Sequence, residues 1–476
     1  MFAPVEVPLW LLILILLFAA VTFASHFLFP SVRWFFRRRM ERAVEKLNKR
    51  LDRPIQPFKL MRRQDNVIRL VYDPSVMEAV ADYALLEDVP RSVAFAKAQS
   101  YAREIVPGFS TAWYFGFAIW LARKLSRLFY TVHLGKGDAE TLRGIDEKSA
   151  VVFVMNHRSN MDYVLVTWLA ADRSALSYAV GEWARIWPLK ALIRAMGAYF
   201  IRRRYSSALY RAVLARYVQM SIEEGVTQAM FPEGGLSQNG AVGPGKKGLL
   251  HYIVRDFTPH RERDVVFVPV ALNYDRVLED RILINAAQSG ERRFKVRLSV
   301  AAGWVWQLIW QKFRGRFQKF GFAAVCYGTP VSLREFVTTH PEASTEALSD
   351  TLMARIRAAV PLLPVPLAAA CLARAEGAAS IAVLQQIASD MAAEARNHGA
   401  NMHLAGGSAQ TALQGGLEAL ALRGIIVVED QAARIVPGQE DVLSFYAASV
   451  LQRLVEPDLP EQLAQPELTL PEVSET

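Results

Sequence analysis

Cysteine is almost absent from this sequence, which has only Cys326 and Cys371 among its 476 residues. The two lie far apart and do not have the short spacing typical of a metal site. The sequence therefore predicts neither a disulfide framework nor a cysteine zinc site. So few cysteines fit a reducing, cytoplasmic environment.

Several motifs that mark large enzyme classes are also missing. The sequence contains no Walker loop, no HExxH pair and no GxSxG elbow. Nucleotide hydrolysis, zincin chemistry and catalysis by an α/β-hydrolase serine therefore lose their usual sequence support. No repeat of fixed period is found along the chain either.

Acidic residues are fewer than basic ones, 46 against 55, which gives a net charge of +9 and an isoelectric point near 9.5. This excess favours an anionic partner such as phospholipid, nucleic acid, phosphate or coenzyme A, and charge alone does not choose among them. The hydrophobic fraction of 52% excludes a disordered chain, and the length is sufficient for two or three domains with cores of their own.

Charge is absent from residues 7–24, "VPLWLLILILLFAAVTFA". A helix needs roughly 20 apolar residues to cross the hydrocarbon core, so this is a borderline span. The basic cluster Arg33, Arg37, Arg38 and Arg39 follows the apolar run, whereas a signal peptide has its basic residues first. We expect residues 1–30 to be a single uncleaved anchor in the cell inner membrane, with the catalytic domain cytoplasmic. A buried N-terminal helix is the alternative.

The anchor is followed by a predicted helical N-terminal region, residues 31–130, with patterns such as "SVMEAVADYALLEDV". Two segments mix aromatic and cationic residues, 113–130 and 304–320. They suit helices that lie in a lipid headgroup layer, and equally suit core helices with tryptophan anchors.

The pattern changes over residues 131–345, where short apolar runs alternate with helical stretches. This alternation predicts an α/β domain. The runs lie at 150–155, 198–201, 229–231, 265–270 and 323–328. An alanine-rich, helical C-terminal region is expected over 346–454, and an acidic, proline-rich disordered tail over 455–476.

Polar residues interrupt the apolar stretch "VVFVMNHRSNMDYVLV", residues 151–166. The run before them reads as a buried strand that carries His157 and Asp162 to a sheet edge, where the two can meet across a turn at a helix start. A carboxylate on one ring nitrogen would orient the histidine as a general base. Ser159 is too near in sequence to be aimed confidently at His157, so the hydroxyl that reacts is more readily the substrate's. A satisfied structural histidine is the alternative.

Three further stretches carry chemistry that fits this pair. "GAYFIRRR" ends in Arg202, Arg203 and Arg204, which suit a phosphate or a membrane-facing patch. "AMFPEGGLSQNG" ends an apolar run in a carboxylate and two glycines, which suits either a close approach to a ligand or a plain tight turn. "VVFVPVALNYD" reads as a strand interrupted by Pro269, an uncommon choice unless the strand bends there.

Taken in order, these four blocks resemble the glycerolipid acyltransferase superfamily. The similarity covers roughly residues 120–340, and "HRSNMDYVLV", "GEWARIWPLKALIRAMGAYFIRR" and "PEGGLSQNG" look most like glycerol-3-phosphate acyltransferases. The resemblance implies an α/β fold with a mixed central sheet flanked by helices. It implies acyl transfer from acyl-CoA or acyl-carrier protein to the sn-1 hydroxyl of glycerol-3-phosphate, with neither cofactor nor metal, beside membrane phospholipid and without nucleic acid.

The same resemblance assigns roles to individual residues. His157 and Asp162 are the expected catalytic pair. The expected substrate-binding residues are Arg158, Ser159, Arg202, Arg203, Arg204, Glu233, Gly234, Gly235, Ser237 and Lys246. Glu233 could instead organise its loop through hydrogen bonds.

One departure concerns the acceptor. The subfamily usually has arginines after Glu-Gly-Gly, and this sequence has Leu236 and Gln238 there. Lys246, Lys247 or Arg204 could substitute for the missing cations. Two other functions therefore stay open beside the favoured one: a lysophosphatidate acyltransferase, and a non-catalytic, membrane-anchored lipid-binding protein on the same fold.

Overall fold

The structure is a computed structural model. It describes residues 8–18, 38–39, 42–135, 142–169, 175–181, 189–202, 207–289, 314, 319–341, 344–397 and 407–454. The chain divides into two compact units. One comprises Met1–Ile55 with Asp172–Ser174, and the other comprises Gln56–Ala171 with Ala175–Thr476.

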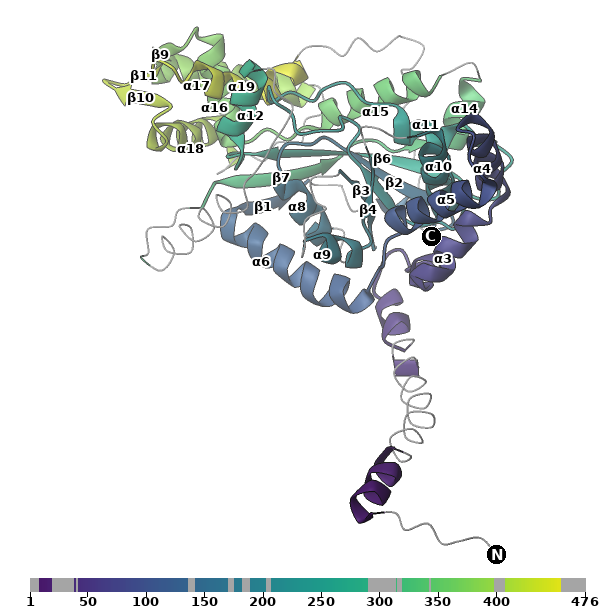
Figure 1. The fold of residues 1–476 in the computed structure, drawn as a ribbon. Coiled ribbons are helices and arrows are strands. Elements are labelled where there is room, and N and C mark those ends of the chain that lie inside the picture. The colour runs from purple at the N-terminus through teal and green to yellow at the C-terminus, as the bar shows by residue number, and fades with distance from the viewer. Residues whose placement is uncertain are drawn as a thin grey trace, which may run out of the picture. The chain divides into compact units, whose positions relative to one another are not determined.

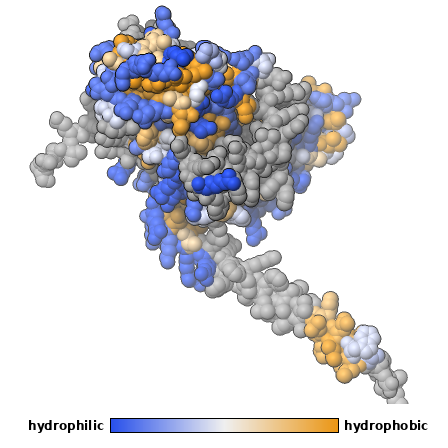
Figure 2. Space-filling view, turned by 90° about the vertical axis from the view of Figure 1, so that its left-hand side faces the viewer, coloured by the Kyte–Doolittle hydropathy of each residue, from blue (hydrophilic) through white to orange (hydrophobic). Residues whose placement is uncertain are grey.

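The first unit contains the start of the predicted anchor. Residues 9–18 are helical, and all but one of their large apolar side chains are exposed, Leu17 for example by 65% and Phe18 by 71%. Figure 2 shows this segment as a cluster of hydrophobic residues. Residues 19–30 of the predicted anchor lie outside the described residues. Over the described parts of the chain, no helix is long and apolar enough to cross a membrane.

The second unit is built around a mixed sheet of eight strands (Figure 1). Its strand order is β1-β7-β6-β2-β5-β3-β4, with β8 paired to β6. The five strands from β6 to β4 are parallel, whereas β7 and β8 run antiparallel to β6. The bounds are β1 (Thr131–Leu134), β2 (Ala150–Met155), β3 (Ser177–Val180), β4 (Tyr199–Phe200), β5 (Gln228–Met230), β6 (Val265–Tyr274), β7 (Phe322–Tyr327) and β8 (Val331–Ser332).

Every residue of β2 is buried, and its side chains alternate between two separate cores. Val151, Phe153 and Met155 belong to the core on one face, and the intervening residues belong to the core on the other. A strand covered on both faces needs a continuous apolar sequence, which is why "AVVFVM" contains no polar residue. The sheet therefore forms the middle layer of three.

Helices cover both faces of the sheet (Figure 1). The first core contains residues of α6 (Ile119–Phe129), α8 (Met161–Leu169) and α12 (Asp280–Ser289). The second core is covered mainly by the N-terminal helices and by those that follow β4, β5 and β8. These are α2 (Pro57–Leu60), α3 (Arg63–Val71), α4 (Pro74–Leu86), α5 (Arg91–Ile105), α10 (Ala208–Glu223), α11 (Gly248–Val254), α14 (Leu333–Thr339) and α15 (Thr345–Ala359).

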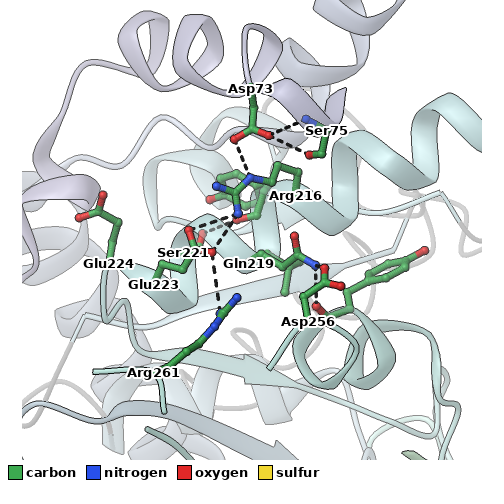
Figure 3. Close-up of polar contacts among 12 residues, drawn as sticks. Asp73, Ser75, Arg216, Gln219, Ser221, Glu223, Glu224, Asp256 and Arg261 are labelled. Carbon is green, nitrogen blue, oxygen red and sulfur yellow. Dashed lines mark hydrogen bonds and ion pairs between the residues drawn. The ribbon is translucent and has the colours of Figure 1, made fainter. Parts of the chain in front are cut away.

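A polar network joins the N-terminal helices to α10 (Figure 3). Asp73 caps α4 by accepting a hydrogen bond from the backbone of Ser75, and its second oxygen accepts one from Nε of Arg216 at 2.7 Å. The same guanidinium donates to Glu223 at 3.0 Å. These contacts lie among helices and at a loop, so we assign them a structural role.

The C-terminal region packs against the same core as α8. Its helices are α16 (Pro364–Arg374), α17 (Ile381–Asn397), α18 (Ala409–Leu422) and α19 (Glu440–Leu454). It also contains an antiparallel sheet in the order β10-β11-β9, with β9 (Ala378–Ser380), β10 (Ile426–Glu429) and β11 (Ala432–Ile435). The sequence predicted a helical region here and did not predict these three strands. The strands have only three or four residues each, too few to interrupt a helical pattern in the sequence.

The predicted α/β fold with a mixed, flanked central sheet is confirmed. All five predicted apolar runs contain a strand, although β1, β3 and β8 were not predicted. β6 continues through Pro269, which lies between the residues that pair with β8 and those that pair with β7. A missing backbone N–H is tolerated where no neighbouring strand needs it. Most of segment 304–320 and the whole of tail 455–476 lie outside the described residues.

Substitution of Gly240 tests how tightly α19 is packed onto the sheet domain. Gly240 has a φ of +83°, and a Cβ added there would lie 1.7 Å from the backbone oxygen of Phe445. We expect Gly240→Ala to lower the free energy of unfolding by about 3 kcal/mol or more, from backbone strain and displacement of α19 together. Unfolding in denaturant measures this change in the free energy of unfolding.

Gly235→Ala is the control, because a Cβ at Gly235 meets no atom within 4 Å. Equal stability of the two variants would contradict this packing.

Candidate active site

The candidate site forms where β2 and β5 end side by side. These strands are adjacent and parallel, with Val154 opposite Met230, so their carboxyl ends meet at one edge of the sheet. The turn after β2 carries His157, and the loop after β5 carries Phe231 and Glu233. Asn156 fixes the start of the turn through two hydrogen bonds with the backbone of Leu272 on β6.

His157 and Asp162 meet as predicted. Nδ1 of His157 lies 2.9 Å from Oδ2 of Asp162, which is in the first turn of α8. Both side chains are buried, with relative exposures of 5% and 0%. With Nδ1–H donated to the carboxylate, Nε2 is the ring nitrogen that can take a proton.

The Asp162 carboxylate is held by more than the histidine. Oδ2 also accepts hydrogen bonds from the backbone N–H groups of Arg158 at 2.7 Å and Ser159 at 3.0 Å. Oδ1 accepts one from the hydroxyl of Tyr274 at 2.6 Å. Burial and the Asp162 charge raise the pKa of Tyr274 well above its usual value, so it stays a donor. The carboxylate is thus fixed in place by four donors.

Two aromatic rings surround the imidazole. The Phe231 ring stacks on His157 with centroids 4.2 Å apart, and the Tyr163 ring meets it edge-on at 5.4 Å. Rings on two sides limit the tilt of the imidazole and exclude water from its faces. Phe231 is therefore part of the site, in addition to the carboxylate and glycines predicted from the same block.

Glu233 organises the loop around the histidine. Oε1 accepts a hydrogen bond from the backbone N–H of His157 at 2.8 Å, and Oε2 accepts one from Gly243 at 3.0 Å. Burial raises the pKa of Glu233 to about 7, against the opposing effect of these two N–H groups. The contacts match the predicted alternative of a loop-organising carboxylate.

The rest of the Glu-Gly-Gly loop is shaped by its backbone. Gly234 has a φ of +70°, and a Cβ there would lie 2.9 Å from Cδ of Lys246, so the lysine side chain lies against this glycine. Ser237 donates its backbone N–H to the carbonyl of His157 and its hydroxyl to the carbonyl of Ala241. Gly235 has open space around it. Of the two proposed substitute lysines, Lys246 lies at this loop, and Lys247 forms an exposed ion pair with Glu346.

Ser159 is turned away from His157. Its hydroxyl donates to Oε2 of Glu279 at 2.8 Å, and the neighbouring Asn160 donates to Oε1 through its backbone and side-chain nitrogens. Burial, against the opposing effect of these hydrogen bonds, raises the pKa of Glu279. Sequence reasoning missed Glu279 and Tyr274, which lie more than 100 residues from the turn that they hold.

Arg158 is fully buried next to His157 in the turn after β2. It donates to the carbonyl of Gly240, and its guanidinium lies 5.0 Å from the centre of the Phe445 ring on α19. Burial lowers its pKa. Val242 adds a second link to α19 by donating its backbone N–H to Gln452 at 2.7 Å. The predicted substrate-binding residue Arg158 thus joins the turn that carries His157 to the C-terminal region.

Arg202 follows β4, three strands along from β2 at the same edge of the sheet. Adjacent strands lie roughly 4.8 Å apart, which separates the ends of β2 and β4 by about 14 Å. Nε and NH2 of Arg202 donate hydrogen bonds to the two oxygens of the Glu104 carboxylate, at 2.9 and 2.6 Å. Arg203 and Arg204 lie outside the described residues. Within the described residues, no cluster of three or more potential metal ligands is found.

Comparisons with known proteins match two consecutive parts of the chain. Residues 137–273 match the Acyltransferase family model, and residues 305–464 match the model of the glycerol-3-phosphate acyltransferase C-terminal region. The first match contains His157, Asp162 and Glu233, and it ends just before Tyr274. The second spans α19, which contacts Arg158 and the Gly240 loop.

Curated relatives carry the name glycerol-3-phosphate acyltransferase. The protein from Alteromonas mediterranea is 27% identical over 59% of this chain and 33% of its own length, and that from Pseudomonas entomophila is 30% identical over 58% and 32%. The chain spans about a third of the length of these relatives. Among solved structures, the 1-acyl-sn-glycerophosphate acyltransferase from Thermotoga maritima aligns with 62% of this chain and 94% of its own, at 18% identity and a TM-score of 0.32.

The two family-model matches and the curated relatives therefore confirm the resemblance of this chain to the glycerolipid acyltransferases, most of all to the glycerol-3-phosphate acyltransferases.

Proposed function

We propose that this chain transfers a fatty acyl group from acyl-CoA or acyl-carrier protein to the sn-1 hydroxyl of glycerol-3-phosphate. The observation that carries the proposal is the buried His157–Asp162 pair, whose carboxylate is held by three donors besides the imidazole. Relatives named for this activity support the choice of acceptor. The match of residues 305–464 to the glycerol-3-phosphate acyltransferase C-terminal region supports this choice further.

The proposed reaction begins when Nε2 of His157 takes the proton of the acceptor hydroxyl. The oxygen attacks the thioester carbonyl, the carbon–sulfur bond breaks, and the imidazolium returns its proton to the thiolate that leaves. Asp162 stabilises the imidazolium and holds its orientation throughout. This reaction needs no covalent acyl-enzyme. Ser159 takes no part in it, because its hydroxyl donates a hydrogen bond to Glu279.

The acceptor phosphate needs cations near the dyad. Lys246 lies against Gly234 in the loop that Glu233 ties to His157, so we assign it the nearest phosphate contact. Arg203 and Arg204 remain proposed phosphate ligands. Arg202 would have to exchange its Glu104 carboxylate for a phosphate, a bidentate partner of the same geometry. Arg158 is buried and is assigned a positioning role.

One observation favours lysophosphatidate as the alternative acceptor. Leu236 packs against the apolar core and Gln238 is uncharged, so this loop offers fewer cations than a small, polar acceptor would need. Lysophosphatidate could be held in part by the bilayer through its own acyl chain. The intact His157, Asp162 and Glu233 speak against the non-catalytic alternative.

Membrane association is part of the proposal. We keep residues 1–30 as an anchor in the cell inner membrane, residues 31–130 as an N-terminal helical region, 131–345 as the acyltransferase domain and 346–454 as the C-terminal region. An exposed aromatic ridge, defined as Trp113, Phe117 and Trp120, supports a second contact with the bilayer.

The ridge lies on the π-helix η1 (Ala112–Ala118) and the first turn of α6, where its three residues have a spacing that places them on one face. Their exposures are 50%, 41% and 52%, and neighbouring rings lie 5.2 and 6.2 Å apart. Lys124 lies 5.2 Å from the Trp120 ring, and Arg127 is exposed on the next turn. Exposed aromatics bordered by cations suit a headgroup layer.

Removal of the proposed base tests the chemistry. We expect His157→Ala to lower kcat for acyl transfer to glycerol-3-phosphate by about 10²- to 10⁴-fold, because general-base assistance is lost, while thermal unfolding stays cooperative. The control is His251→Ala, an exposed histidine on α11. Near-normal turnover of a folded His157→Ala protein would show that another group is the base.

Stability against pH tests the buried Glu233. The pKa of Glu233 is raised from 4.5 to about 7, so the folded state favours the protonated side chain. The contribution of this group to the stability of the folded state is complete below pH 4.5 and is lost as pH rises through 7. Glu233→Gln carries no charge at any pH. As pH rises from 5 to 8, we expect the free energy of unfolding of the wild type to fall by roughly 2 kcal/mol relative to that of Glu233→Gln.

The control for Glu233 is Glu78→Gln, at an exposed position on α4. If both variants followed the wild-type profile, Glu233 would not titrate in this range.

A fluorescent label tests whether the ridge meets the bilayer. Cys326 and Cys371 are buried, so a cysteine at the ridge can be labelled selectively with an environment-sensitive dye. We expect the emission of labelled Phe117→Cys to shift to the blue when phospholipid vesicles are added, as the dye leaves water.

Labelled Leu86→Cys is the control, since Leu86 is 80% exposed at the end of α4. Unchanged emission at both positions would show that the ridge does not contact the bilayer.

A further inference from the structure

Apart from the candidate active site, two adjoining depressions share the side chain of Arg63. One lies between α3 and α5, has a volume of about 380 Å³ and includes Arg103. The other has a volume of about 320 Å³ and includes Gly108, Lys190 and Arg194, the last two from α9 (Leu189–Ala195). We call the pair the Arg63 pocket.

The lining of the Arg63 pocket is positive and contains no carboxylate. Arg63, Arg103 and Lys190 form no ion pair with any described residue. The nearby carboxylate of Glu104 is engaged through both oxygens by Arg202. Burial and the charge of Arg103 lower the pKa of Arg63, which indicates that the cations are not compensated. A bound anion would relieve this repulsion.

Two of the cations are held in fixed positions by the end of α5. Nε of Arg63 donates to the carbonyl of Val106 at 2.9 Å, and its NH2 donates to that of Arg103. NH2 of Arg194 donates to the carbonyl of Glu104 at 2.8 Å. The last carbonyls of a helix have no partner within it, so these guanidiniums cap α5. NH1 of Arg63 makes no hydrogen bond within the described residues and is available to a ligand.

Capping explains Arg63 and Arg194 but not the other two cations. Neither the Arg103 guanidinium nor the Lys190 ammonium donates a hydrogen bond to a described residue, although each lines the pocket. Arg63 and Arg103 line one depression, and Arg63, Lys190 and Arg194 line the other, so each offers cationic N–H donors suited to the oxygens of a phosphate.

We propose that the Arg63 pocket binds the phosphate group of a ligand, at a site separate from the His157 centre. Two sources can supply such a group. One is the headgroup of an anionic phospholipid, because Gly108 lines the pocket and the aromatic ridge begins five residues later at Trp113. The other is a free phosphate ester, such as the nucleotide part of coenzyme A.

The test measures binding by calorimetry to the full chain in neutral detergent. The probes are inorganic phosphate, coenzyme A and dihexanoylphosphatidylglycerol, with dihexanoylphosphatidylcholine as the zwitterionic comparison. The test variant is Arg103→Gln with Lys190→Gln, which removes two charges and no side-chain hydrogen bond to a described residue. The control is Arg69→Gln with Arg91→Gln, which removes two exposed charges from α3 and α5 outside the pocket.

The pocket variant is expected to bind at least one anionic probe about tenfold or more weakly, while the control variant binds like the wild type. Loss confined to phosphatidylglycerol identifies a headgroup site, and loss confined to phosphate or coenzyme A identifies a free ester. Equal binding of all anionic probes by both variants overturns the proposal. His157→Ala should retain the pocket affinity, so failure of the proposed acyl transfer would be seen separately.

Discussion

The arrangement of the site depends on the position of one carboxylate. Asp162 accepts hydrogen bonds from His157, from the backbone of the turn that follows it, and from Tyr274 on the neighbouring strand. These donors come from the turn after β2 and from the last residue of β6, and Asp162 itself lies in the first turn of α8. A buried polar group is tolerated only when its hydrogen bonds are complete, so these elements must meet in one geometry to hold Asp162. The orientation of the imidazole follows from that geometry.

The C-terminal region contributes to the same geometry from behind. Phe445 on α19 lies under the guanidinium of Arg158, whose backbone N–H binds Asp162. The close approach of α19 requires a glycine at position 240, and the carbonyl of that glycine accepts a hydrogen bond from Arg158. Two stretches that match separate family models therefore share one buried contact. A displaced α19 would act on the turn that carries His157 through Arg158.

The sequence was sufficient for features that depend on neighbouring residues. The apolar run of β2, the five-residue spacing of His157 and Asp162, and the turn at Gly234 each follow from local pattern and backbone preference. Motif resemblance added the order of the blocks. Together these predicted the α/β sheet and the meeting of His157 and Asp162 at one edge of it.

Features that depend on distant residues could not be predicted in this way. Tyr274 and Glu279 reach the catalytic turn from more than 100 positions along the chain, and Arg202 is paired with Glu104, 98 positions before it. The strands β9, β10 and β11 are too short to give a periodic signal. Burial of Arg158 against Phe445 joins residues nearly 300 positions apart. Such pairings arise from tertiary packing, which single-sequence patterns do not encode.

The most direct test of the proposed function is a comparison of acceptors. Purified protein is given a labelled acyl-CoA with glycerol-3-phosphate, dihydroxyacetone phosphate or lysophosphatidate, each alone, and kcat/KM is measured for each. We expect the highest kcat/KM with glycerol-3-phosphate. Acylation of lysophosphatidate without acylation of glycerol-3-phosphate would contradict the proposed function.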